Sequence, residues 1–419
     1  MQIKIPLKRI DSLFQIDIQK IYLLDKRQIS LAFFYTGILI AYYGSLHPWF
    51  MWSLGQLYPI PAAMFISLSY LISNSMSKPL FLRRDFVLPL IFYTLFSFLP
   101  LMTKERTINY YIVNVFSILV FFGLLKLNTS LLPRLATVLS KSMAILLIPS
   151  MLFFLLYLLG FSLPSRNAVY GEAHYSFSNY YFFMIDDRFI SLFIPRFQSV
   201  FLEPGHLGSA TTVLLMTQIS QWKRWWNVVL IIASVISFSL AAYAIFIALI
   251  FLGLWVRRKN IVRHVVLSVS LLFLVVLSAT FYNGGDNMVN NMILARLEVD
   301  EQTGEMVGNN RVDKNFEKEF DKFIWTSDAF LGLEMHRIPE GTGNSGYRVF
   351  IYQNGLIGLL FVFLFYAFSF KEYSDIRYLL TAVFISILIF WIRGYPLWES
   401  NFIPILVTAY SKYNLKLAN

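Results

Sequence analysis

The sequence predicts an all-α polytopic membrane protein with about twelve transmembrane helices, and three observations support this prediction. Of the 419 residues, 57% are hydrophobic and only 14% are charged, and the mean hydropathy is +0.60, whereas soluble domains carry about 25% charged residues. Apolar runs long enough to cross a bilayer recur from Ile29 to Tyr410. Basic residues gather in alternate short loops between these runs, as the positive-inside rule requires.

The apolar runs define the predicted transmembrane segments. They cover residues 30–46, 50–72, 86–101, 108–127, 137–160, 204–221, 226–238, 240–256, 262–281, 347–370, 376–392 and 398–412. The basic loops are the N-terminal segment and the loops at 78–84, 126–141, 223–224, 257–264 and 371–377. Every second loop belongs to this set, so we expect both termini in the cytoplasm. A short loop at 103–107 carries both signs of charge and does not follow the pattern.

We expect one integral membrane domain at residues 30–415, preceded by a cytoplasmic amphipathic segment at 1–29. That segment lacks the continuous apolar region and cleavage site of a secretory signal. Two long loops, at about 161–203 and 282–346, then fall on the outer side, where we expect amphipathic helices. The stretch between Arg224 and Arg257 has basic flanks at both ends. An even number of crossings is therefore required, and a tight helical hairpin satisfies it.

The composition also disfavours several functions. The net charge of +11 follows from the positive-inside loops, so we expect no nucleic-acid partner. The middles of the predicted segments contain no Asp, Glu, Lys or Arg, which argues against an ion-coupled transporter. The chain has no cysteine, which excludes a thiolate metal site or a cysteine nucleophile. No Gly-rich phosphate loop appears on the cytoplasmic side, and we expect no cofactor.

Ionisable residues gather where the first outer loop meets the next apolar segment, in "RFQSVFLEPGHLG". Glu203 precedes Pro204, which suits the first position of a helix, and His206 follows within one turn. Serine, aspartate or asparagine would cap the helix better than glutamate does. An interaction with the helix dipole alone therefore does not account for a glutamate at position 203. We therefore interpret Glu203 as the first candidate catalytic residue and His206 as the second, with Arg196 as a candidate ligand for an anionic substrate.

This pattern of an arginine followed by Glu-Pro resembles the motif of bacterial polysaccharide polymerases of the Wzy type. These belong to the superfamily of O-antigen polymerases and ligases, which are multi-span glycosyltransferases. The second outer loop adds to the resemblance, because Arg311 lies in the position of the loop arginine and "NGLIG" begins the following span. Together the two motifs cover roughly residues 190–365. Ligases often carry a histidine where this chain has "GTGNSGY", and this departure favours a polymerase.

The resemblance implies the polymerisation of polyprenyl-diphosphate-linked oligosaccharide repeat units on the outer face of the bacterial inner membrane. Donor and acceptor would be undecaprenyl-diphosphate-linked oligosaccharides, with membrane lipids and a chain-length regulator as further partners. A base must take the acceptor proton, and positive charge must stabilise the departing diphosphate. With no Asp-x-Asp motif in the outer loops, arginines would replace a metal. The candidate substrate contacts are Arg196, Arg311, Arg348, Arg393, Tyr347 and Asn344.

Other interpretations remain open on the sequence alone. The paired carboxylates of Asp186 and Asp187 leave a metal-dependent reaction possible in principle. An O-antigen ligase would use the same donor and deliver the glycan to a lipid-core sugar. A polysaccharide flippase also has about twelve spans and would move its substrate without forming a bond, but flippases seldom need long outer loops.

Overall fold

The computed structural model describes residues 25–76, 78–102, 107–171, 175–189, 195–257, 261–285, 287, 290–295, 297–299, 314–333, 346–371, 373 and 375–411. Most of the N-terminal segment predicted to be amphipathic, and the predicted contacts Arg311 and Asn344, lie outside these residues. Within them the chain is mostly helical, and each predicted apolar segment overlaps a helix.

The helices keep the order expected from the sequence. Those in the predicted spans are α3 (Lys26–Gly44), α4 (Pro59–Asn74), α5 (Val87–Phe98), α6 (Ile108–Lys126), α7 (Leu132–Leu158), α8 (Pro204–Thr217), α9 (Trp225–Ile236), α10 (Leu240–Val256), α11 (Ile261–Phe281), α13 (Tyr347–Ser369), α14 (Ile376–Arg393) and α15 (Glu399–Ala409). Helix α12 (Lys314–Phe323) lies in the second long loop. Short 3-10 turns occupy Trp49–Met51, Gly55–Leu57, Leu99–Met102, Thr129–Leu131, Asp187–Phe189, Tyr282–Gly285 and Ser327–Phe330, and a π turn occupies Asn290–Leu294.

Five helical segments in the described part of the chain are long and apolar enough to cross a membrane. They are Gly55–Asn74, Ile108–Lys126, Thr129–Leu158, Tyr347–Ser369 and Ile376–Arg393. Shorter apolar helices occupy Val87–Met102, Trp225–Ile236 and Leu240–Val256. These helices fit a helical membrane protein. The twelve crossings and their direction stay predictions from the sequence.

The stretch between Arg224 and Arg257 is divided into two helices, as the hairpin interpretation requires. Helices α9 and α10 are separated by Ser237–Ser239, and Phe238 adopts a left-handed backbone conformation with φ 46°. Ser239 begins α10, and its hydroxyl accepts a hydrogen bond from the Ala242 amide at 3.4 Å. Both helices pack against α8. A single tilted helix, the alternative that would invert the downstream topology, is not what this segment forms.

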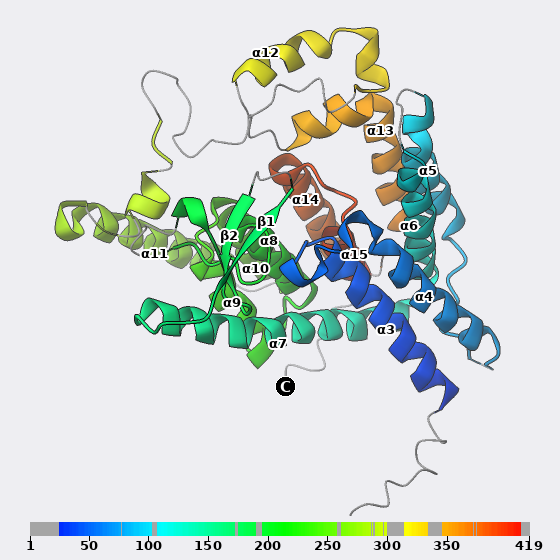
Figure 1. Ribbon diagram of the computed structural model, residues 1–419, viewed down its shortest axis with the longest axis horizontal. Coiled ribbons are helices and arrows are strands. Elements are labelled where there is room, and N and C mark those ends of the chain that lie inside the picture. The colour runs from blue at the N-terminus through cyan, green and yellow to red at the C-terminus, as the bar shows by residue number, and fades with distance from the viewer. Residues whose placement is uncertain are drawn as a thin grey trace, which may run out of the picture.

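Helices α8 and α15 form the centre of the molecule and pack against each other (Figure 1). Every residue of both helices is buried. Helix α8 is also covered by α7, α9 and α10. Close packing depends on Gly208, where a Cβ atom would lie 2.4 Å from the Ala242 side chain of α10. The side chains within these two helices are therefore shielded by protein, whereas the side chain of Glu203, which precedes α8, is 35% exposed.

The first long loop contains a small β-sheet, whereas the sequence predicts amphipathic helices there. Strands β1 (Arg166–Tyr170), β2 (Tyr175–Asn179) and β3 (Met184–Asp186) form an antiparallel sheet in the order β1-β2-β3. The alternation of aromatic residues with serine in "YSFSN" is the strand signal that this expectation overlooked, whereas "RNAVY" shows no such alternation.

The sheet lies over the segment that follows α3. Phe177 and Met184 are buried beside Trp49 and Trp52. The Trp49 amide donates to the Val200 carbonyl oxygen at 3.0 Å. The sheet and this short segment thus enclose the chain that leads into α8.

Helix α12 is amphipathic, as predicted, but its apolar face packs on protein. Phe316, Phe320 and Phe323 are buried with Tyr352 of α13. The Tyr352 hydroxyl also donates to the Glu319 carboxylate at 2.5 Å. Helix α12 therefore lies at the edge of the molecule against the first turns of α13 (Figure 1).

Candidate functional site

Glu203 forms an ion pair with Arg393, from which it is separated by 190 residues in the sequence. Arg393 Nη1 lies 3.2 Å from Glu203 Oε2. Glu203 occupies the N-cap position of α8 in an extended conformation, yet its side chain makes no capping hydrogen bond. Arg393 is the last residue of α14, and its side chain is only 11% exposed. The structure thus joins two of the residues that the sequence marked as candidates.

Glycines on both partners make this contact possible. At Gly205, a Cβ atom would lie 1.6 Å from Arg393 Nη2, so only glycine lets the guanidinium rest on the first turn of α8. Gly394 ends α14 in a left-handed conformation with φ 70°. A Cβ there would lie 2.3 Å from the carbonyl oxygen of Gly346, which precedes α13. The end of α14 is therefore held against the start of α13, and this fixes the direction of Arg393.

A cluster of aromatic rings, centred on Trp398, lies beside His206 next to the ion pair. The His206 ring meets the Trp398 ring edge-on, with centroids 5.3 Å apart. Trp398 also contacts two further rings. It stacks on Tyr395 with ring centroids 4.3 Å apart, and its centroid lies 5.6 Å from that of His47. His47 has a left-handed backbone with φ 52°. Neither His47, Tyr395 nor Trp398 was predicted from the sequence.

Burial and the neighbouring charges shift the pKa values of Tyr395 and His47, which lie outside the apolar segments. Burial raises the pKa of the Tyr395 hydroxyl, the Glu203 charge raises it further, and Arg393 opposes both. Burial lowers the pKa of His47 from 6.5, and a hydrogen bond with the Ser45 backbone opposes this. Both groups therefore remain neutral near pH 7.

Two helix N-termini converge at this cluster. A small cavity is lined by Leu46, His206, Ser209, Ala210, Arg393, Tyr395, Trp398, Ser400 and Asn401. The α8 residues come from its first two turns and the α15 residues from its first turn. Helix N-termini carry a partial positive charge and unpaired amides, so both helices favour negative charge here. A second acidic residue, Glu399, begins α15 and accepts a hydrogen bond from the Tyr58 hydroxyl at 2.9 Å.

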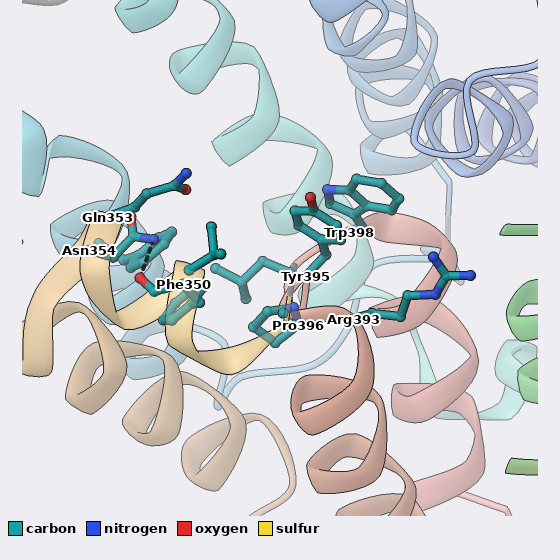
Figure 2. Close-up of a pocket in the computed structure, with 12 residues that line it drawn as sticks. Phe350, Gln353, Asn354, Arg393, Tyr395, Pro396 and Trp398 are labelled. Carbon is teal, nitrogen blue, oxygen red and sulfur yellow. Dashed lines mark hydrogen bonds between the residues drawn. The ribbon is translucent and has the colours of Figure 1, made fainter. Parts of the chain in front are cut away.

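A larger cavity of about 190 Å³ lies on the other side of the chain that joins α14 to α15. It is lined by Phe96, Gly346, Val349, Phe350, Gln353, Asn354, Arg393, Gly394, Tyr395, Pro396, Leu397 and Trp398. Figure 2 shows the amides of Gln353 and Asn354 on one side, with Tyr395 and Trp398 between them and Arg393. The Arg393 guanidinium points away from these amides. Arg393, Tyr395 and Trp398 therefore separate the two cavities and line both.

The other predicted contacts lie elsewhere. Arg348 forms an ion pair with Glu317 of α12, and the Tyr347 ring stacks on Trp391 with centroids 4.9 Å apart. Arg196 is close enough to Tyr243 of α10 to affect its hydroxyl electrostatically. The residues that line the two cavities do not include Arg196, Tyr347 or Arg348. Arg311 and Asn344 cannot be placed, because they lie outside the described residues.

The paired carboxylates of the first outer loop have partners within that loop. Asp186 Oδ2 lies 2.5 Å from Arg188 Nη2, and Asp187 Oδ1 accepts a hydrogen bond from the Ser178 hydroxyl at 3.0 Å. In the described part of the chain, no group of three or more His, Asp or Glu residues is arranged to hold a metal ion.

One signal could have identified the missed part of the site. Glu399 follows an aromatic stretch, "YPLW", and begins an apolar segment, just as Glu203 does after "SVFL". The two acidic residues start the two fully buried helices.

Chemically, the arrangement offers a carboxylate able to accept a proton, a guanidinium able to bind an oxyanion, and two helix ends that favour negative charge. Comparisons of this chain with protein-family models, curated proteins and solved structures give no match.

Proposed function

We propose that this protein polymerises polyprenyl-diphosphate-linked oligosaccharide repeat units into O-antigen or capsular polysaccharide on the outer face of the bacterial plasma membrane. The main support is the Glu203–Arg393 pair, which places a proton acceptor and an anion-binding group together at the start of a buried helix. The sequence resemblance adds the reaction class, since the Glu-Pro motif contains Glu203.

In this reaction, a hydroxyl of the incoming unit attacks the anomeric carbon of the growing glycan. A new glycosidic C–O bond forms as the bond between that carbon and the diphosphate oxygen breaks. Glu203 accepts the hydroxyl proton, and the diphosphate leaves on its polyprenyl carrier. Arg393, next to Glu203, neutralises the charge that develops on the leaving diphosphate.

The remaining residues have supporting roles in the proposal. His206 is the second candidate for the base, since it lies one turn into the same helix. The N-termini of α8 and α15 add positive potential for the diphosphate. Arg196 and Arg311 stay predicted contacts of the lipid-linked substrate. Arg348 lines neither cavity and forms an ion pair with Glu317 of α12, so in this proposal it positions α12 and does not bind diphosphate.

Deletion of the gene, followed by gel analysis of the surface polysaccharide, tests the proposal. A polymerase defect leaves a single repeat unit attached to the lipid core. Long polymer that is not attached to the core would instead identify a ligase, and lipid-linked units trapped in the cytoplasmic leaflet would identify a flippase. Complementation with the wild-type gene must restore long chains, and complementation with Glu203→Gln must not.

A further inference from the structure

Four residues that line the smaller cavity each carry a buried polar atom with no hydrogen-bond partner among the described residues. These atoms are His206 Nδ1, Ser209 Oγ, Arg393 Nε and Ser400 Oγ. Each of these side chains belongs to a residue that is at most 9% exposed. All four residues line the same cavity. Buried polar groups in folded proteins nearly always have a partner, so four such atoms on residues that line one cavity indicate a shared ligand.

The size of the cavity limits what this ligand is. The cavity volume of about 10 Å³ is close to the minimum that holds one water molecule. A carboxylate, a phosphate group or a sugar ring is much larger. The ligand therefore presents a single oxygen atom to the four side chains.

The hydrogen-bonding groups of the four side chains limit further which ligand can bind in the cavity. The Arg393 Nε–H can only donate, whereas the two serine hydroxyls can donate or accept. A neutral imidazole has one donor and one acceptor nitrogen. The ligand must accept a hydrogen bond from Arg393 and is able to donate one to His206. A metal cation fails the first condition, because the guanidinium repels it. A hydroxyl oxygen meets both conditions.

We propose that this pocket binds one hydroxyl oxygen, which accepts a hydrogen bond from Arg393 Nε–H and donates one to His206 Nδ1. The two serines complete its coordination. The bound oxygen links His206 to the guanidinium whose Nη1 contacts Glu203. His206 is then a positioning residue that acts on Glu203 through the oxygen and Arg393.

Two sources supply such an oxygen. Water can fill the pocket in the resting protein, and a hydroxyl of the acceptor sugar other than the attacking one can take its place when the substrate binds. The second source rests on the proposed function, whereas the first does not. The pocket itself is therefore testable without any assay of chain growth.

Solid-state NMR of the full-length protein in lipid bilayers tests this proposal directly. The chain contains 5 histidines, so ¹⁵N-histidine labelling gives a simple spectrum, and His206→Asn identifies the His206 signals. Magnetisation transferred from water should reach His206 Nδ1 in the wild type. Absence of this transfer would overturn the proposal.

Variants of the pocket serines supply the matched comparison. Ser209→Val places methyl groups in the cavity and should reduce the water transfer by about tenfold, since the hydrogen bonds to the oxygen are lost. Ser209→Ala and Ser400→Ala, which fit the same space, should each move the His206 Nδ1 shift. The control is Thr212→Val on the same helix, because the Thr212 hydroxyl already donates to the Gly208 carbonyl oxygen at 2.8 Å. Equal transfer in Ser209→Val, Thr212→Val and wild type would also reject the pocket.

The two sources are then distinguished by adding lipid-linked repeat units isolated from cells that lack this protein. Loss of the water signal at His206 shows that the sugar hydroxyl displaces water, whereas an unchanged signal shows that the oxygen is a fixed water. Either result requires the pocket. If gene deletion leaves chain growth normal while the water transfer is present, the proposed function fails and the hydroxyl pocket stands.

Discussion

The described part of the chain contains two arginine–glutamate pairs that bridge distant helices, and they differ in their surroundings. Arg393–Glu203 lies at the start of a helix that is buried on every side, next to two cavities that Arg393 lines. Arg348–Glu317 joins α12 to α13 at the edge of the molecule, and its arginine side chain is 26% exposed, against 11% for Arg393. The glutamate side chain is 35% exposed in both pairs. The same two residue types thus occupy a central and a peripheral position.

The difference shows why residue type alone does not identify a site. Partly exposed ion pairs contribute little to stability and often join surface helices. Burial of one partner, here the Arg393 guanidinium, costs desolvation free energy, so such a pair is weak evidence for stability. Its retention beside a cavity is easier to explain by function. We therefore assign the chemistry to the central pair and the attachment of α12 to the peripheral one.

The largest expected effect is that of Glu203→Gln, which tests the central pair directly. The amide keeps the shape of the side chain but cannot accept the acceptor proton, so chain growth should fall by about 100-fold or more. The measurement is the length distribution of the surface polysaccharide at matched protein levels in the membrane. Long chains of normal abundance in this variant would reject Glu203 as the base.

Gly205→Ala should have the next largest effect, because the new methyl group would occupy the position of Arg393 Nη2. The guanidinium must then move away from Glu203, and we expect about a tenfold or greater loss of chain growth. Gly253→Ala on α10 is the matched control, since its Cβ would meet the nearest atom, Ile219 Cγ2, at an ordinary 3.4 Å. If the two variants behave alike, the close contact between Gly205 and Arg393 is not required.

Glu317→Gln tests the peripheral pair and should have a small effect. Loss of the ion pair with Arg348 should lower the free energy of unfolding by at most about 1 kcal/mol and leave chain growth within about twofold. Thermal unfolding in detergent, together with polysaccharide gels, measures both quantities. A loss of chain growth as large as that of Glu203→Gln would return Arg348 to the list of substrate contacts.

His47→Asn should produce the smallest effect, confined to acidic pH. Burial lowers the pKa of His47 below 6.5, so in the acid range below 6.5 the unfolded chain binds a proton that the folded protein does not. Stability should therefore decrease as the pH falls below 6.5, until His47 is also protonated in the folded state. Asparagine tolerates the left-handed backbone at this position, so the variant should show a shallower decrease in melting temperature below pH 6.5. An unchanged slope would mean that His47 does not contribute.

The sequence alone determined most of the helical segments, but not all of their ends: the segment predicted at 50–72 begins its α-helix only at Pro59. Hydropathy is a local property, so the apolar runs and the basic residues between them predict helices wherever the chain must satisfy its own backbone in lipid. The break between α9 and α10 and the amphipathic helix α12 were predicted in the same way. Local chemistry also placed Glu203 at the start of α8, because Pro204 suits the first helical turn.

Only the tertiary structure decided which charged residues meet. Four arginines were candidates for the anionic substrate, and nothing near Glu203 in the sequence indicated that Arg393 would contact it. That choice depends on how α14 and α15 pack against α8, and in particular on the space left by Gly205. The β-sheet of the first loop was missed because its strands are only three to five residues long, and amphipathic helices were expected in both outer loops. Helix packing brings together residues that are far apart in the chain, and the sequence around each residue does not predict which partner it will contact.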